Sequence, residues 1–496
     1  MIKKISFLFI PFLLINPVFA QDSDFEAWKK KEAESFKQFK DAEDKAFIGF
    51  LRADWKAFKA SLGEKPDETP KPKKIPIAET QPNRNIIGYK KSNKVTETTK
   101  PEISKAYKAP PKKVAEPVAE ERENFNFSEA AFYGSPFAVS YPKKVPQSIT
   151  SKVTSELIAK FYESMASSQY DSTLRQALFY KRWYGLNDWG FALLLSKMAL
   201  QVYPKSTDSR HLFVWFFLLK SGFDARVGYD DEGVALMLPS ENTMYATPYF
   251  TIDSKRFYLI SFEGKPAKAR SLYTYEGKNP KSIKLINLSF SQPLLLKPSS
   301  QVRRLSFEYN GEKISFAVAY NRSNVEFLKA YPQTNIQLYF DSKIPKDLEA
   351  SLLGALQPYL TGKTEAEAAN FLLRFVQKAF QYKTDDDQFG YEKYFFPEES
   401  IFYPYCDCED RSILYAYLIR KLIGLEVVGL DYPGHIATAV KFSSPLEGDF
   451  DKLEVNGDSY IICDPTYINA DIGMAMPNLK NTVPTIIPLQ APNRAR

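Results

Sequence analysis

The chain has 496 residues and a formal net charge of +7, and it contains only three cysteines and two histidines. The lysines and arginines are spread along the chain without a nucleic-acid-binding motif, so nucleic-acid binding is not predicted. Three cysteines are too few for a disulfide framework, and their odd number leaves at least one thiol free.

The first 20 residues have the pattern of a secretory signal peptide. Lysines at positions 3 and 4 are followed by an apolar stretch over residues 5–15, and small residues near 18–20 precede the expected cleavage site. This stretch is shorter than the roughly 20 residues that span a bilayer, and no later stretch is long and apolar enough. We therefore expect a periplasmic or secreted protein with no transmembrane segment after cleavage.

Residues 21–63 are predicted to form an amphipathic helix. Its aromatic pairs recur in steps of 11 residues, as in Phe36/Phe39 and Phe47/Phe50. An 11-residue repeat corresponds to about 3.67 residues per turn, which keeps the aromatic stripe on one helix face. Either the helix packs on its own globular domain, or residues 25–62 bind an envelope partner or a second copy in a coiled coil.

Residues 64–124 are rich in proline, lysine and glutamate and lack an apolar period. Such a segment buries too little apolar surface to offset the entropy lost on ordering. We predict a disordered, extended linker between the helix and the globular part.

From residue 125 onward the sequence indicates an α+β fold. An Asn310-Gly311 turn between alternating apolar segments predicts a β-hairpin. Apolar periods near 3.6 predict helices over 152–167, 187–202, 209–221, 364–381 and 409–423. We divide this part into a first domain (125–280), a β-rich connector (281–345), a second domain (346–480) and a tail (481–496).

The two predicted domains share a faint repeat. Residues 207–238 and 409–440 each contain an apolar helix, a glycine that ends it, an extended run and a further strand. We hypothesise that 125–280 is a degenerate copy of the second domain; the alternative is chance similarity between two helix–glycine–strand units. A different strand order in the two domains would contradict the copy. The alignment pairs Cys408 with Ser206 and His435 with Val234, and puts Asp464 near Phe262; His211 in the first domain is predicted to pack or cap.

The second domain contains Cys408, His435 and Asp464, in that order. Cys408 is predicted at the start of a helix, where backbone N–H groups favour a thiolate and can receive an oxyanion. His435 begins an apolar strand after a Pro-Gly turn, and Asp464 ends another strand. A thiol, an imidazole that deprotonates it and a carboxylate that orients the imidazole form a catalytic triad.

Three phrases, "CEDRS", "GH" and "DPTY", carry a resemblance to the transglutaminase-like superfamily of cysteine enzymes over roughly residues 346–470. The resemblance implies a papain-related fold in which Cys408 is the nucleophile, His435 the general base and Asp464 the orienting carboxylate. The chain departs from the pattern after the histidine, where Ile436-Ala437 replaces the Ala-Trp of many members.

These features predict an exported cysteine hydrolase that cleaves amide or peptide bonds through an acyl-enzyme. Envelope proteins and peptidoglycan peptides are the candidate substrates, and no cofactor or metal is predicted. Two alternatives stay open: acyl transfer to an amine, as in cross-linking transglutaminases, and a non-catalytic envelope scaffold with a relic triad.

Several neighbours of the triad have two interpretations each. Cys406 and Cys463 could form a regulatory disulfide with Cys408, although strand alternation favours a packed Cys463. Asp410 is expected to interact with the helix dipole or a basic residue. Tyr403 and Tyr405 either line the cleft or belong to the core.

Overall fold

A computed structural model describes residues 44–52, 55–58, 123–262, 270–275 and 282–491, with the short pieces 67–68, 80, 94–95, 109–110 and 268. The predicted signal peptide, most of the predicted aromatic helix and most of the predicted linker lie outside the described residues. Within them the fold mixes helices and sheets, which confirms the α+β class. No helix in this part of the chain is long and apolar enough to cross a membrane.

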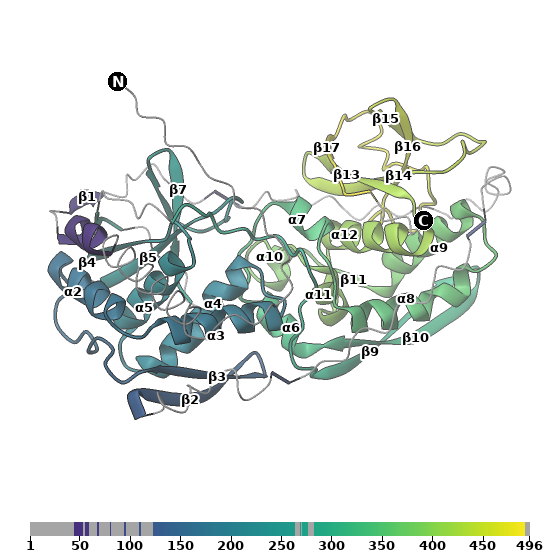
Figure 1. The fold of residues 1–496 in the computed structure, drawn as a ribbon. Helices are drawn as coiled ribbons and strands as arrows, with labels where there is room; N and C mark the ends of the chain where they lie inside the picture. The colour runs from purple at the N-terminus through teal and green to yellow at the C-terminus, as the bar shows by residue number, and fades with distance from the viewer. Residues whose placement is uncertain are drawn as a thin grey trace, which may run out of the picture.

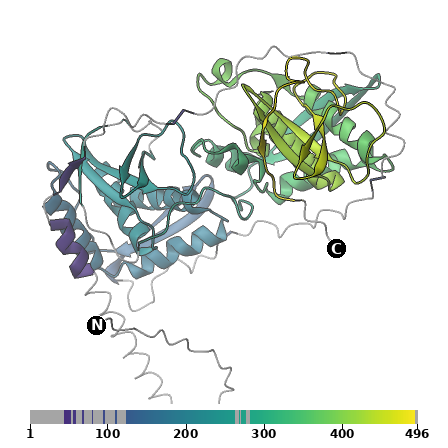
Figure 2. The same cartoon turned by 90° about the horizontal axis from the view of Figure 1, so that it is seen from above.

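Two lobes lie side by side (Figure 2), one from the first half of the chain and one from the second. The first lobe begins with a hairpin, continues with helices and ends in a sheet (Figure 1). The hairpin is β2 (Phe125–Phe132) and β3 (Ser135–Pro142), and the helices are α2 (Ser155–Ala166), α3 (Asp171–Trp183), α4 (Asp188–Val202) and α5 (Thr207–Lys220). The sheet contains β1 (Lys56–Phe58), β4 (Arg226–Asp230), β5 (Gly233–Pro239), β6 (Tyr249–Ile252), β7 (Lys255–Ile260) and β8 (Leu272–Thr274).

The second lobe has the same plan with additional short elements. Its hairpin is β9 (Ser300–Tyr309) and β10 (Glu312–Asn321), and its helices are α6 (Arg322–Leu328), α7 (Ile336–Phe340), α8 (Lys346–Leu360), α9 (Glu365–Ala379), α10 (Asp385–Gln388), α11 (Pro397–Phe402) and α12 (Cys408–Leu418), which continues as a π-helical turn (Ile419–Ile423). Its strands are β11 (Gln381–Tyr382), β12 (Tyr405–Cys406), β13 (Glu426–Tyr432), β14 (His435–Lys441), β15 (Lys452–Val455), β16 (Asp458–Cys463) and β17 (Thr485–Ile487).

The predicted hairpin turn is confirmed, because Asn310 and Gly311 both have positive φ between β9 and β10. This hairpin packs on α8 and α9, just as β2 and β3 pack on α4 and α3. The segment predicted as a connector therefore supplies a layer of the second lobe.

The two main sheets have the same strand order. It is β6-β7-β5-β4-β8 in the first lobe, with β1 added at the β8 edge, and β15-β16-β14-β13-β17 in the second. Every corresponding pair is antiparallel, and each position is filled by the strand of the same rank along the chain. A different strand order, which would have contradicted the hypothesis of a degenerate copy, is therefore not observed among the described strands.

The strand pairs correct the predicted alignment by one residue at each triad position. The hairpin closes at Tyr432↔His435 in the second lobe and at Asp230↔Gly233 in the first. The sequence alignment was wrong because it matched two glycines, Gly434 and Gly233, of which one lies in the turn and the other begins the strand. By these pairs and the helix starts, the first lobe has Thr207, Gly233 and Ser261 where the second has Cys408, His435 and Asp464.

His211 has a structural role in the first lobe. Its Nδ1 lies 2.6 Å from the carbonyl oxygen of Val234, so the ring binds helix α5 to strand β5. In the second lobe the Ser412 hydroxyl donates to the Ile436 carbonyl at 3.0 Å and joins α12 to β14 in the same way. The expectation of a packed histidine is confirmed.

The described piece of the N-terminal aromatic helix, residues 44–52, packs on the first lobe. Phe47 is 1% exposed and contacts the rings of Tyr162, Trp215 and Tyr275, with centroids 5.1–6.2 Å away. Phe50 is 46% exposed. The described part of this helix therefore supports the first alternative, in which the helix packs on its own domain.

Replacing Phe47 with Leu is expected to lower the free energy of unfolding by about 1–2 kcal/mol, because aromatic pairs and close packing are lost. The matched change Phe50→Leu, one turn further along an exposed face, should stay within about 0.5 kcal/mol of the wild type. Urea denaturation measures both. Equal effects of the two changes would contradict the packing described.

Candidate active site

The centre of the site is a buried histidine–aspartate pair. His435 is the first residue of β14, and Asp464 directly follows the neighbouring strand β16. His435 Nε2 lies 2.9 Å from Asp464 Oδ2, and each side chain is 2% exposed. The other carboxylate oxygen, Oδ1, accepts the backbone N–H groups of Thr466 and Tyr467 at 2.9 and 3.2 Å. The carboxylate is therefore held so that it can orient the imidazole.

Cys408 reaches the same end of the sheet from helix α12. It is the first residue of that helix, which packs on β14, and it is buried. The fold thus joins His435 to Asp464 across two adjacent strand ends and places Cys408 at the start of a helix that packs on the strand of His435.

The Cys408 thiol donates to a neighbouring carboxylate. Its sulfur lies 3.0 Å from Glu409 Oε2, and no hydrogen bond joins it to His435 within the described residues. The pKa of Cys408 lies well above its usual value, first because burial disfavours the thiolate and then because Glu409 and Asp407 repel it. Burial and the two acidic neighbours thus act against the predicted thiolate at this helix start.

The other two cysteines are free and buried, so no disulfide involves them. The Cys463 thiol lies 3.5 Å from the Ile461 carbonyl and packs in the core, as strand alternation predicted. The Cys406 sulfur lies 3.9 Å from the Ser400 carbonyl. Asp410 accepts the Phe395 N–H at 2.9 Å and has a structural role at the start of α12.

A cavity of about 550 Å³ opens beside His435. His435, Glu409 and Asp431 line it, and Tyr245 of the first lobe forms part of its wall. The remaining lining residues come mainly from the β13–β14 turn and from residues 483–488. Tyr403, one candidate for the cleft, instead stacks on Phe395 with ring centroids 4.7 Å apart and belongs to the core.

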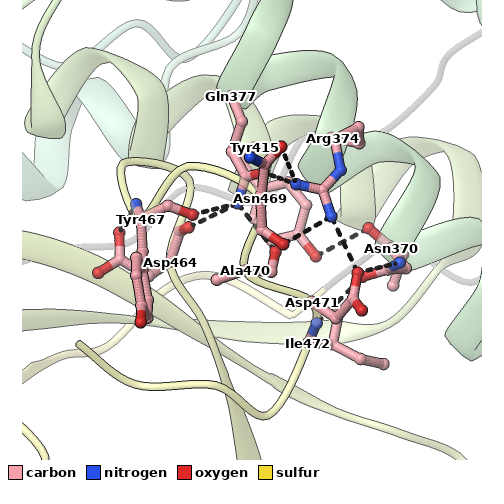
Figure 3. Close-up of polar contacts among 11 residues, drawn as sticks. Asn370, Arg374, Gln377, Tyr415, Asp464, Tyr467, Asn469, Ala470, Asp471 and Ile472 are labelled. Atoms are coloured by element: carbon pink, nitrogen blue, oxygen red, sulfur yellow. Dashed lines mark hydrogen bonds and ion pairs between the residues drawn. The ribbon is translucent and has the colours of Figure 1, made fainter. Parts of the chain in front are cut away.

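A buried polar network holds the loop that follows Asp464 (Figure 3). Gln377 Nε2 donates to the carbonyls of Asp464, Tyr467 and Ala470 at 2.8–3.2 Å. On the same helix, Arg374 binds Asp471 at 3.0 Å. This network was not predicted from the sequence. Its signal is the helical spacing of polar residues 370, 374 and 377, which are separated by apolar residues in α9.

The buried carboxyl group of Glu398 is expected to make the stability of the fold depend on pH. Glu398 on α11 is 1% exposed, and burial raises its pKa from 4.5 to about 8. The folded chain thus binds more protons than the unfolded chain between these values, so stability should fall as the pH rises from about 5 to about 8.

Glu398→Gln should remove most of this pH dependence, because an amide does not titrate. The amide also keeps an oxygen for the Asn321 N–H, which Glu398 Oε1 now accepts at 3.1 Å. Thermal unfolding at pH 5, 6.5 and 8 measures the effect. The variant should exceed the wild type in melting temperature at pH 8 and approach it at pH 5. A parallel pH profile for both proteins would contradict the assignment.

Comparison with known proteins gives no match to any family model and no match to a curated protein sequence.

Proposed function

We propose that this protein is an exported cysteine hydrolase of the transglutaminase-like class, which cleaves amide or peptide bonds through Cys408, His435 and Asp464. The observation that supports it most is the buried hydrogen bond of 2.9 Å between His435 and Asp464, made beside a cysteine at a helix start. A histidine held this way presents its other nitrogen, Nδ1, as a base.

The reaction would proceed through an acyl-enzyme. His435 takes the thiol proton, the Cys408 sulfur attacks the carbonyl carbon, and the N–H groups at the start of α12 stabilise the oxyanion. His435 then gives the proton to the leaving amine as the C–N bond breaks. Water, deprotonated by His435, attacks the thioester, which releases the carboxylic acid and returns the proton to the thiol.

The cavity lining suggests the substrate class. Glu409 and Asp431 are acidic, Tyr394 and Tyr432 add aromatic faces, and the described residues of the lining include no lysine or arginine. Peptides with an amino or guanidinium group near the scissile bond complement such a wall. Envelope proteins and the amine-bearing stem peptides of peptidoglycan have this chemistry.

The first lobe would be a degenerate copy of the second. The support is the shared strand order and the replacement of the cysteine, histidine and aspartate of the second lobe by Thr207, Gly233 and Ser261. Since Tyr245 reaches the cavity, the copy would help to bind substrate.

One observation favours a second candidate, a non-catalytic envelope protein. The Cys408 thiol is 2% exposed and donates to Glu409 rather than to His435. Catalysis requires the thiol to turn from Glu409 to the imidazole, whereas a relic site would keep the contact seen here.

Alkylation by iodoacetamide distinguishes the two. In the hydrolase, Cys408 reacts at pH 7.5 while buried Cys406 and Cys463 do not, and His435→Ala slows the reaction at least about tenfold. Mass spectrometry of tryptic peptides identifies the modified thiol. Cys406→Ser is the matched control, and its Cys408 should react at the wild-type rate. Equally slow modification of all three thiols, or no effect of His435→Ala, would support the non-catalytic protein.

A further inference from the structure

A free strand edge borders the candidate active-site cavity. β17 is the last strand of the second-lobe sheet, and no described strand pairs with its outer side. All three residues of β17 line the cavity together with His435. The outer side of such a strand carries backbone N–H and C=O groups that can pair with another extended chain. We call the outer side of residues 484–488 the β17 edge.

The strand pairs show which backbone groups point outward at this edge. The β13–β14 hairpin closes at Tyr432↔His435 across a two-residue turn, so these residues form a hydrogen-bonded pair. Alternation along β13 then directs the N–H and C=O of Asp431 toward its partner in β17, Thr485. The next residue, Ile486, therefore directs its N–H and C=O away from β13. Among the described residues, no further backbone hydrogen bond of Ile486 is found.

The first lobe shows the corresponding edge with a strand bound to it. Its sheet has the same strand order, in which β8 has the place of β17. β1, from the N-terminal part of the chain, adds antiparallel to β8, with Lys56 opposite Thr274 and Phe58 opposite Leu272. Counted from the two hairpins, Thr274 has the position of Ile486. The position that binds a strand in the first lobe thus has no described strand in the second, where it borders the cavity.

Two prolines limit what the β17 edge can bind. Pro484 and Pro488 lie two residues before and after Ile486, where alternation gives the same outward direction, and neither has a backbone N–H. The Pro488 carbonyl already accepts the Gln337 side-chain amide at 2.9 Å. The edge therefore offers one outward N–H, at Ile486, and the carbonyls of Pro484 and Ile486. Prolines at an edge oppose the pairing of two long strands, so a short segment fits this edge better than a second copy of the sheet.

We propose that the β17 edge binds an extended segment of the peptide substrate by strand addition, with the N–H and C=O of Ile486 as the main backbone contacts. This inference rests on the proposed hydrolase function, because it assigns the segment to the substrate. Neighbouring strands lie roughly 4.8 Å apart, so the added strand lies about 14 Å from β14, which begins with His435. An extended chain spans that distance in about four residues. The bound segment is therefore about four residues away from the bond that is cleaved.

The surroundings of the edge favour a segment with both apolar and basic side chains. Val483 directly precedes the edge, lines the cavity and is 90% exposed. Glu409 and Asp431 supply carboxylates to the same lining. An extended peptide that alternates valine and lysine has both kinds of side chain, on opposite faces of the strand.

Fluorescence anisotropy tests the proposal on the mature full chain with Cys408→Ala, which removes the nucleophile. The probe is a fluorescein-labelled decapeptide of alternating lysine and valine. Adding Ile486→Pro removes the outward N–H and should weaken binding at least about fivefold. Adding Pro484→Leu supplies a second outward N–H, with the residue type of the equivalent position in the first lobe, and should tighten binding about two- to tenfold. Glu454→Pro is the matched control, because Glu454 has the same outward direction on β15, the opposite edge of the same sheet, and it should leave binding unchanged.

Melting temperatures establish that the variants are folded, and Pro484→Leu tests the edge without introducing a proline. No binding of the decapeptide at millimolar concentration, or equal binding by all variants, would overturn the proposal. A dimer that dissociates on Ile486→Pro would overturn it in favour of a second copy at the edge. Unchanged binding with a melting temperature below that of Glu454→Pro would do so in favour of a segment of this chain.

A separate measurement distinguishes failure of this inference from failure of the hydrolase function. In chains that keep Cys408, the burst of p-nitrophenol from p-nitrophenyl acetate should be equal with and without Ile486→Pro, because this small ester does not reach the edge. No burst in either protein would contradict the hydrolase function. A normal burst together with decapeptide binding that does not depend on Ile486 would overturn the role of the edge alone.

Discussion

Replacing Asp464 with Asn is expected to lower the rate of Cys408 acylation by about 10²–10⁴-fold, the range seen when the orienting carboxylate of a catalytic triad is removed. The amide is nearly the same size and keeps an oxygen for the N–H groups of Thr466 and Tyr467. It loses the charge that holds the His435 tautomer and stabilises the imidazolium. The geometry of the His435–Asp464 pair is thus conserved, while His435 becomes a weaker base.

The burst of p-nitrophenol from p-nitrophenyl acetate measures this rate without a known substrate. Asp458→Asn is the control, because Asp458 lies at the exposed start of the same strand, β16. It should acylate at the wild-type rate. Circular dichroism and the melting temperature establish that Asp464→Asn is folded. A folded Asp464→Asn protein with a wild-type burst would show that the His435–Asp464 pair does not act in catalysis.

Replacing Arg374 with Met is expected to lower the free energy of unfolding by about 3–5 kcal/mol, because it removes the positive charge that pairs with the buried Asp471 carboxylate. The side chains of Arg374 and Asp471 are 6% and 5% exposed, so water cannot replace the lost interaction. The guanidinium also donates to the backbone carbonyl of Asn469 at 2.8 Å, in the loop that leads away from Asp464.

Lys378→Met is the matched control, because it removes the same charge from the exposed face of α9. Its effect should stay within about 0.5 kcal/mol. Guanidinium denaturation followed by circular dichroism gives both values. A loss below 1 kcal/mol in Arg374→Met would mean that the loop after Asp464 is held by other contacts, chief among them the Gln377 amide.

Much of the local structure was predictable from the sequence. The apolar period placed the helices at 187–202 and 364–381 within two residues of α4 and α9. The longest helices it missed, α3 and α8, pack on the hairpins and have weaker patterns, since α3 carries several polar residues and α8 contains Pro358. Propensity and periodicity are local, so they fail where packing compensates for a poor pattern.

The candidate site was predictable in its residues but not in its electrostatics. His435 and Asp464 follow strand and turn signals, and neighbouring antiparallel strands bring them together. The hydrogen bond from the Cys408 thiol to Glu409 could not be predicted, because the thiol can face either of two acidic neighbours or His435. The side-chain rotamers that decide between them depend on the surrounding core.

Local patterns in the sequence predicted the α+β class, the helix that begins at Cys408, the turn before His435 and the strand that leads to Asp464, because these depend on contacts between residues close in the chain. The common strand order of the two lobes and the meeting of the buried carboxylates of Asp385, Glu392 and Asp407 became visible in the three-dimensional fold. These depend on pairing between distant segments, and a chain-local pattern carries no information about which distant partner a strand or a buried carboxylate will have.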